Sequence, residues 1–158
     1  MDLRVASAID VHAFGDDLTK PLRLACITWE EDRALSGHSD GDVAAHAVAD
    51  ALLMASGIGE LGSVFGVDKP EYAGASGERI LRETLSLLKK ENWKVNNISV
   101  QIIAQRPKFS PRKKEAEKVM EAIIGAPVSV SATSTDHLGT LGRMEGIGAL
   151  ATVCIVKG

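Results

Sequence analysis

The chain has 158 residues and a formal net charge of −3, with 45% hydrophobic and 25% charged residues. This composition is typical of a globular protein, and the length suits one domain with a real core. Aromatic residues make up only 4%, so neither charge nor composition favours binding to nucleic acid or to an anionic membrane. No apolar run reaches the ~18 residues of a membrane span and no signal peptide is visible, so we expect a cytoplasmic protein. Cys26 and Cys154 lie in apolar runs, and we expect buried, unpaired thiols there.

Turn residues and apolar periodicity predict the elements of the first half of the chain. Residues 3–14 and 22–29 are expected to be strands, and the turn residues at 15–17 favour a hairpin between them. A helix is predicted from Asp42 to Ser56, with Gly57 as its stop. Residues 57–77 are rich in glycine and are expected to form a long functional loop.

The second half is predicted to alternate helices and strands. A helix capped by Ser76 runs to about residue 92, and a second helix opens at Ser110-Pro111 and ends at Gly125. Strands are expected at 95–105, 128–134 and 147–156, with a glycine-rich loop at 136–146. The predicted fold class is α+β, with a single sheet of about four to five strands, helices packed on one face, and one domain over residues 1–158.

Three residues form a candidate metal site. Asp10 and His12 are two apart in a predicted strand, so their side chains share a face, and His46 comes from the first predicted helix. Two imidazoles and one carboxylate suit Zn²⁺, and three protein ligands leave the fourth position open, as in catalytic zinc sites. The structural alternative is a set of hydrogen-bonded core histidines.

Two pairs of polar residues near His46 could support such a site, one pair on the predicted helix and one pair before it. Asp42, His46 and Asp50 are spaced i, i+4 and i+8, so either aspartate is predicted to accept the free ring N–H of a metal-bound His46. The alternative is a solvated helix face in which Asp42 simply favours the helix dipole. His38 and Ser39 lie beside the predicted helix start, where backbone N–H groups attract anions, so they are candidate phosphate contacts.

Five segments occur in an order that points to a known family. They are Asp-Val-His-Ala-Phe at 10–14, the run from Gly37 to Ala51 that opens Gly-His-Ser-Asp-Gly-Asp-Val, Ile-Ala-Gln-Arg-Pro-Lys at 103–108, Ala-Thr-Ser-Thr-Asp at 132–136, and Gly-Arg-Met-Glu-Gly at 142–146. Together they resemble the 2-C-methyl-D-erythritol 2,4-cyclodiphosphate synthases of the non-mevalonate isoprenoid pathway, over essentially the whole chain. The resemblance implies conversion of 4-diphosphocytidyl-2-C-methyl-D-erythritol 2-phosphate to the cyclic diphosphate, with release of CMP.

The resemblance also implies roles for individual residues. Asp10, His12 and His46 would bind one Zn²⁺ per subunit, Asp136 would bind a second cation, Mg²⁺ or Mn²⁺, and His38 and Ser134 would be catalytic. The substrate would be contacted by Asp10, His12, His38, Ser39, Glu60, Leu61, Gly62, Phe65, Ala104, Gln105, Arg106, Pro107, Lys108, Phe109, Ser110, Thr133, Ser134, Thr135, Asp136, Thr140 and Arg143. The family is a homotrimer with active sites between subunits, in which Arg143 and Glu145 would face the central channel.

The implied chemistry suits these residues, because the 2-phosphate of the substrate attacks its own β-phosphate and no protein nucleophile is required. Cations and Lys108 would offset the repulsion between the two anions. Two other functions fit the residues. One is a zinc-dependent phosphohydrolase with Asp42 or Asp50 as the general base, and the other is a non-enzymatic trimer that binds a small molecule and uses its histidines structurally.

Overall fold

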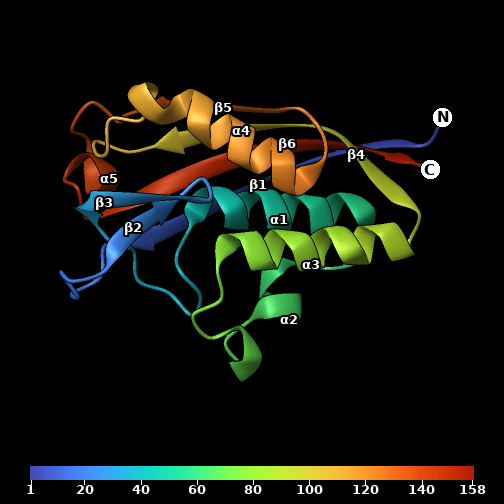
Figure 1. Cartoon of the computed structure of the whole chain (residues 1–158), viewed down its shortest axis with the longest axis horizontal. Coiled ribbons are helices and arrows are strands. Elements are labelled where there is room, and N and C mark those ends of the chain that lie inside the picture. Colours follow the sequence, from blue (N-terminus) through green and yellow to red (C-terminus); the bar gives the residue numbers. More distant parts are fainter.

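The computed structural model describes residues Met1–Gly158 and is built around a four-stranded mixed sheet (Figure 1). The strands lie in the order β1 (Leu3–Ala13), β6 (Gly146–Lys157), β4 (Trp93–Ile103) and β5 (Val128–Thr133). β6 is antiparallel to both of its neighbours, whereas β4 and β5 are parallel. The predicted α+β class and the predicted number of strands are confirmed.

Three long helices cover one face of this sheet: α1 (Val43–Ser56), α3 (Gly77–Lys90) and α4 (Lys113–Ile124) (Figure 1). The helices begin and end where the sequence indicates. The Asp42 side chain caps α1, and its C-cap Gly57 has a φ of 76°, in the left-handed region that glycine tolerates. The Ser76 side chain accepts from the N–H of Arg79 at the start of α3, and Gly125 ends α4.

The opposite face of the sheet is open and partly apolar. Along β1 the residues alternate between half-buried and exposed, and the exposed set includes Val5, Ile9 and Val11, with 55–68% of their surface accessible. Leu150 on β6 continues this surface and is 40% exposed. Exposed apolar side chains that lie together on one face of a sheet make it a candidate contact surface. We define Val5, Ile9, Val11 and Leu150 as the open apolar face.

The predicted hairpin between residues 3–14 and 22–29 is wrong. The second segment contains two strands, β2 (Pro21–Leu24) and β3 (Ile27–Arg33), which pair with each other in a separate two-stranded sheet. Ala25 and Cys26 form the turn between them with φ values of 54° and 62°. Two-residue hairpin turns of this kind usually contain Gly or Asn, so Ala25 and Cys26 carry no turn signal.

Two predicted loops contain short helices. Residues 57–77 include α2 (Leu61–Phe65) and a 3₁₀ turn at Pro70–Tyr72, and residues 136–146 include α5 (Gly139–Gly142). A second 3₁₀ turn, at Ser110–Arg112, precedes α4. Both cysteines are unpaired, with Cys26 buried and Cys154 partly exposed.

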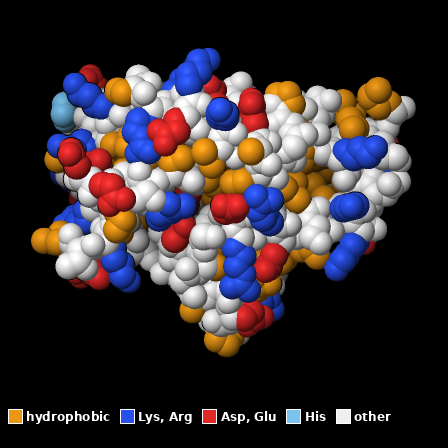
Figure 2. All heavy atoms as spheres, in the orientation of Figure 1, with side chains coloured by type: hydrophobic (Ala, Val, Ile, Leu, Met, Phe, Trp, Pro, Cys, Tyr) orange, Lys and Arg blue, Asp and Glu red, His pale blue; other side chains and the backbone are white.

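The outer surface of the helical layer carries both signs of charge. Figure 2 shows Lys and Arg interspersed with Asp and Glu over this side of the molecule, with no large area of a single sign. None of the helices has both the length and the hydropathy that crossing a lipid bilayer requires.

Candidate functional site

Asp10, His12 and His46 meet where β1 packs against α1. Asp10 and His12 lie on the face of β1 that turns toward the helices, and His46 comes from the first turn of α1. One ligand atom from each residue lies within 4.8 Å of the other two. The Asp10 Oδ2 atom is 3.0 Å from His12 Nε2 and 3.2 Å from His46 Nδ1. The predicted convergence of these three side chains is confirmed.

The His12 ring is fixed from behind by the backbone of the following loop. Its Nδ1 lies 2.6 Å from the carbonyl oxygen of Ser36, a distance at which Nδ1–H donates, so Nε2 faces the other two ligand groups. Gly37 packs directly on the ring, because a Cβ at this position would lie 2.8 Å from His12 Cε1. Only glycine fits there without moving the imidazole.

The His46 ring is held between Asp10 and the loop before α1. Its side chain is 3% exposed, and its Nε2 lies 2.8 Å from Ser39 Oγ. The nearest Asp40 carboxylate oxygen is farther from Nε2, at 3.9 Å. His46 therefore presents Nδ1 to the centre of the cluster and Nε2 to the loop.

The charges of the cluster stabilise one another. The hydrogen bond to Asp10 raises the pKa of His12 above its usual value, against the opposing effect of burial. Burial acts to raise the pKa of Asp10, but hydrogen bonds and charge attraction from His12 and His46 outweigh it and leave that pKa lowered. Asp10 is thus ionised at neutral pH and can offer an anionic oxygen to a metal ion.

This donor set fits a divalent transition metal. One carboxylate and two imidazoles are the ligands that catalytic zinc sites use, and both imidazoles have a hydrogen-bond partner on the nitrogen that faces away from the cluster. The cluster also lies open to a cavity of about 220 Å³. Its other walls come from the loop before α1, from α2 and the residues after it, and from α3, and they are His38, Ser39, Leu61, Gly62, Phe65, Gly66, Val67 and Ile80.

The prediction that Asp42 or Asp50 accepts the ring N–H of His46 is wrong. The Asp42 carboxylate is fully buried and accepts from the backbone N–H groups of Ala25, Cys26 and Ala45 at 2.8–3.1 Å. It is the cap of α1, so its side chain folds back over the helix start instead of following the helix face. Asp50 accepts from the N–H of Leu61 at 2.8 Å and so holds the start of α2.

His38 is fixed by the segment that follows α2. Its Nε2 lies 3.0 Å from the carbonyl oxygen of Lys69, and its own carbonyl oxygen accepts from the N–H of Gly74 at 2.7 Å. Within this segment, Phe65 packs edge-on against Tyr72 with ring centroids 4.8 Å apart. His38 and Phe65 line the same cavity, and their contact with substrate stays a prediction.

Most of the remaining predicted site residues lie elsewhere, after the parallel strands β4 and β5, whereas Glu60 stands directly before α2. The N–H of Ala104 donates to the carbonyl oxygen of Thr133 at 2.9 Å, and the Gln105 side chain contacts His137 at 3.3 Å. Segment 104–110 therefore lies beside segment 133–136, which includes Ser134. The sheet order puts β5 three strands from β1, or about 14 Å at about 4.8 Å per strand. Within one chain, the structure does not bring this group to Asp10 and His12.

Individual side chains in this second group differ in their access. Lys108 is exposed and makes no ion pair, whereas Arg106 lies 3.4 Å from Asp32 on β3. Phe109 is only 3% exposed and packs against Trp29, so its side chain belongs to the core. Arg143 donates to Glu145 at 2.7 Å on the exposed loop around α5, which also carries Thr140.

Sequence reasoning missed the residues that orient the side chains of the candidate metal site. Ser36 acts through its backbone carbonyl, which any residue type provides, and Gly37 acts through the absence of a side chain. Asp40 accepts from the N–H of Asp42 at 3.0 Å and from the N–H of Gly77 at 2.9 Å, and so joins the starts of α1 and α3. No local pattern links residues 40 and 77.

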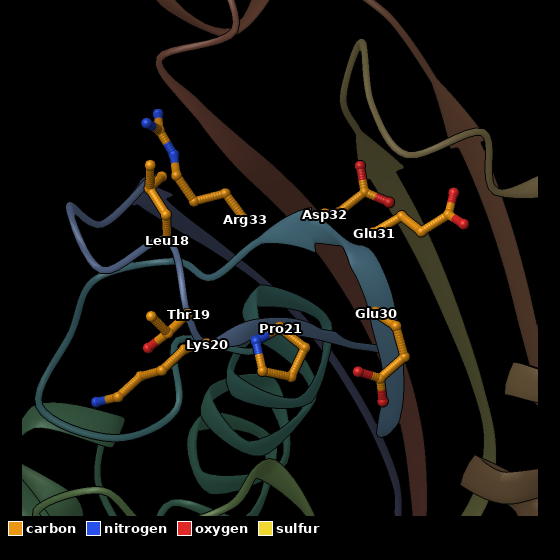
Figure 3. Close-up of a pocket in the computed structure, with 8 residues that line it drawn as sticks. All are labelled: Leu18, Thr19, Lys20, Pro21, Glu30, Glu31, Asp32 and Arg33. Carbon is orange, nitrogen blue, oxygen red and sulfur yellow. The ribbon is translucent and has the colours of Figure 1, made fainter.

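A second hollow, of about 240 Å³, lies along the β2–β3 hairpin (Figure 3). It contains charged residues of both signs, but Figure 3 shows that they diverge. Lys20 and Arg33 point to one side of the hairpin, and Glu31 and Asp32 point to the other. No group of these side chains converges on a common point, so this hollow shows no arrangement for chemistry.

Comparison with known proteins gives a consistent result. Residues 3–156 match the model of the YgbB family. The chain is 43% identical to 2-C-methyl-D-erythritol 2,4-cyclodiphosphate synthase of Cutibacterium acnes, over 100% of this chain and 94% of that protein. It is 47% identical to the bifunctional enzyme IspD/IspF of Clavibacter michiganensis over 98% of this chain, but it spans only 37% of that longer relative. It superposes on IspF of Plasmodium falciparum, solved as a CDP complex, with a TM-score of 0.83, at 26% identity, covering 98% of this chain and 96% of that one.

Proposed function

Because this chain belongs to the YgbB family, we propose that it acts as a 2-C-methyl-D-erythritol 2,4-cyclodiphosphate synthase. It converts 4-diphosphocytidyl-2-C-methyl-D-erythritol 2-phosphate to the 2,4-cyclodiphosphate and releases CMP. An oxygen of the 2-phosphate forms a bond to the β-phosphorus, and the bond from that phosphorus to the bridging oxygen breaks, so CMP leaves with the electron pair. The observation that carries the proposal is the Asp10, His12 and His46 cluster, open to a cavity, in a chain of this family.

Asp10, His12 and His46 hold Zn²⁺ in this proposal, one ion per subunit, and Asp136 holds a second cation, Mg²⁺ or Mn²⁺. When bound, these ions supply positive charge that offsets the repulsion between the reacting phosphates. The chain's own groups do the rest. His38 and Ser39 hold the methylerythritol phosphate end in the cavity, and Phe65 with Leu61 and Gly62 closes its wall.

Segments 104–110 and 133–136 bind the other end of the substrate. Backbone groups of 104–110 hold the cytidine, and the exposed Lys108 faces a phosphate. Thr133, Ser134 and Thr135 supply hydroxyl groups for the diphosphate, and Ser134 contacts the oxygen on which charge develops. The attacking group belongs to the substrate, so tethering provides the proximity advantage.

We further propose that the protein is a homotrimer in which neighbouring chains complete each site. Two observations support this. The metal cluster lies at the β1 side of the sheet and segment 133–136 follows β5 at the other edge, so one chain does not bring them together. The open apolar face provides a surface for a second copy to cover. Arg143 and Glu145 then face the central channel, and the single domain over residues 1–158 works in the cytoplasm.

The phosphohydrolase alternative loses its general base in this structure. It required Asp42 or Asp50, but both carboxylates are engaged by backbone N–H groups away from the cluster.

The test of the proposed synthase activity is to incubate the purified protein with the cytidine-linked substrate in ¹⁸O-labelled water and to follow CMP and the second product. We expect CMP and an unlabelled cyclic diphosphate, lost with a chelator and restored by Zn²⁺ with Mg²⁺. Label in the phosphate product, or no CMP at all with both metals present, would refute the proposal.

A further inference from the structure

His46 has two polar partners, one on each ring nitrogen. Its Nδ1 lies 3.2 Å from Asp10 Oδ2, and its Nε2 lies 2.8 Å from Ser39 Oγ. The ring is almost completely buried, so these two groups are its nearest polar partners. Which nitrogen carries the proton therefore depends on these two neighbours.

Metal binding at this cluster requires one particular tautomer of His46. A ligating nitrogen carries no proton, and Nδ1 is the atom that faces Asp10 and His12. Nε2 must then carry the proton and donate it to an acceptor. Ser39 Oγ is the atom within hydrogen-bond distance, and a hydroxyl can accept there while keeping its own proton for another partner.

Asp40 does not take this role in the structure. Its nearest oxygen is 3.9 Å from Nε2, beyond hydrogen-bond distance. Both of its carboxylate oxygens already accept backbone N–H groups, from Asp42 and from Gly77. These bonds fix the carboxylate between the starts of two helices, so it cannot move toward His46 without breaking them.

We propose that Ser39 is a positioning residue for the metal site, which accepts the Nε2–H of His46 and thereby presents Nδ1 to the ion. This role adds to the phosphate contact proposed above and rests on the metal binding in the proposed function. Because Ser39 also lines the cavity, its hydroxyl hydrogen stays available to a substrate oxygen. One hydroxyl thus connects the metal ligand to the bound substrate.

The test measures zinc affinity directly, by competition with a chromophoric chelator at fixed pH and without substrate. Ser39→Ala leaves a buried donor unpaired, so we expect zinc affinity to fall about 10- to 100-fold, as for other partners of metal-bound histidines. Ser86→Ala, at an exposed position of α3, is the matched control and should bind zinc as the wild type does.

A second pair of variants keeps the shape constant. Ser39→Thr and Ser39→Val differ only in the hydroxyl, so Thr should retain most of the affinity and Val should lose as much as Ala does. Equal zinc affinity in Ser39→Ala and wild type, or in the Thr and Val variants, overturns the proposal while leaving the proposed function intact. If the wild type itself binds no zinc, the metal part of the proposed function fails, and this proposal fails with it.

Discussion

The contact between Gly37 and His12 gives the sharpest test of how the metal cluster is held. In Gly37→Ala, the new Cβ would lie 2.8 Å from Cε1 and 2.9 Å from Nδ1 of the imidazole. Carbon atoms in contact prefer about 3.5 Å or more, so the ring or the loop must give way by about 0.7 Å. The φ of Gly37 is outside the left-handed region, so the backbone itself accepts alanine without strain.

The effect of this displacement on zinc affinity depends on the contacts at the other side of the His12 ring. His12 Nδ1 is already 2.6 Å from the Ser36 carbonyl, and a ring pushed away from Gly37 loses the alignment of that hydrogen bond and of Nε2. Ligand-orienting contacts are worth about 10- to 100-fold in metal affinity. The overpacking itself should cost about 1–3 kcal/mol of folding stability.

The assay is zinc affinity by chelator competition, with CMP release at limiting and at saturating zinc. We expect Gly37→Ala to bind zinc more weakly and to recover part of its activity when zinc is raised. Gly15→Ala is the matched control, since a Cβ there meets its nearest neighbour, the Ala34 carbonyl oxygen, at an ordinary 3.5 Å. Wild-type zinc affinity in Gly37→Ala would refute the reasoning.

Three further predictions concern folding, pH and assembly. Asp42→Ala strands three buried N–H groups and should lower the free energy of unfolding by about 3 kcal/mol or more; a urea midpoint equal to that of the wild type would contradict this. In metal-free protein, the Asp10–His12 pair should contribute most to the free energy of unfolding at pH values between the usual pKa values of the two groups. Asp10's share is lost as pH falls through its lowered pKa, and His12's share is lost as pH rises through its raised pKa; the check is the difference in urea midpoint between wild type and His12→Gln across pH. Ile9→Asp puts a charge on the open apolar face and should shift the proposed trimer toward monomer in sedimentation, whereas Met54→Asp, on exposed helix surface, should not.

The sequence predicts the long elements well because their ends carry local chemistry. The α1 helix has its cap and its glycine stop in the chain itself, and α3 has its serine cap. The metal cluster was also predictable, because alternation on a strand puts Asp10 and His12 on one face regardless of what packs there. The two-residue period of the strand determines which way the Asp10 and His12 side chains point. The packing of β1 against α1 then adds His46 and completes the cluster.

The β2–β3 hairpin was not predictable for the opposite reason. Its turn residues, Ala25 and Cys26, have no preference for positive φ, which costs of order 1–3 kcal/mol per residue. The Asp42 carboxylate, from a residue 16 positions away from Cys26, binds both turn N–H groups and stabilises the conformation. A turn that is stabilised by tertiary contacts need not contain residues that favour turns, so the local sequence does not predict it.

The position of Asp42 also explains why helical spacing predicts the wrong partner for His46. Helical spacing correctly places positions 42, 46 and 50 on one face, but a cap residue lies outside the helix and its side chain turns back. The partner of His46 instead comes from Ser39, before the helix, where spacing rules do not apply. Hydrogen bonds to a ligand depend on loop conformation, which the sequence does not show.

The proposed site has parts on both sides of the sheet, so zinc affinity and CMP release test different parts of it. Asp10, His12 and His46 all belong to one chain, so zinc affinity should not depend on assembly. Segments 104–110 and 133–136 follow β4 and β5, on the far side of the sheet from β1. If a neighbouring chain supplies them, a dissociated variant such as Ile9→Asp should keep its zinc and lose CMP release. Zinc loss that accompanied dissociation would mean that the neighbouring chain also shapes the metal cluster, contrary to the geometry of the single chain.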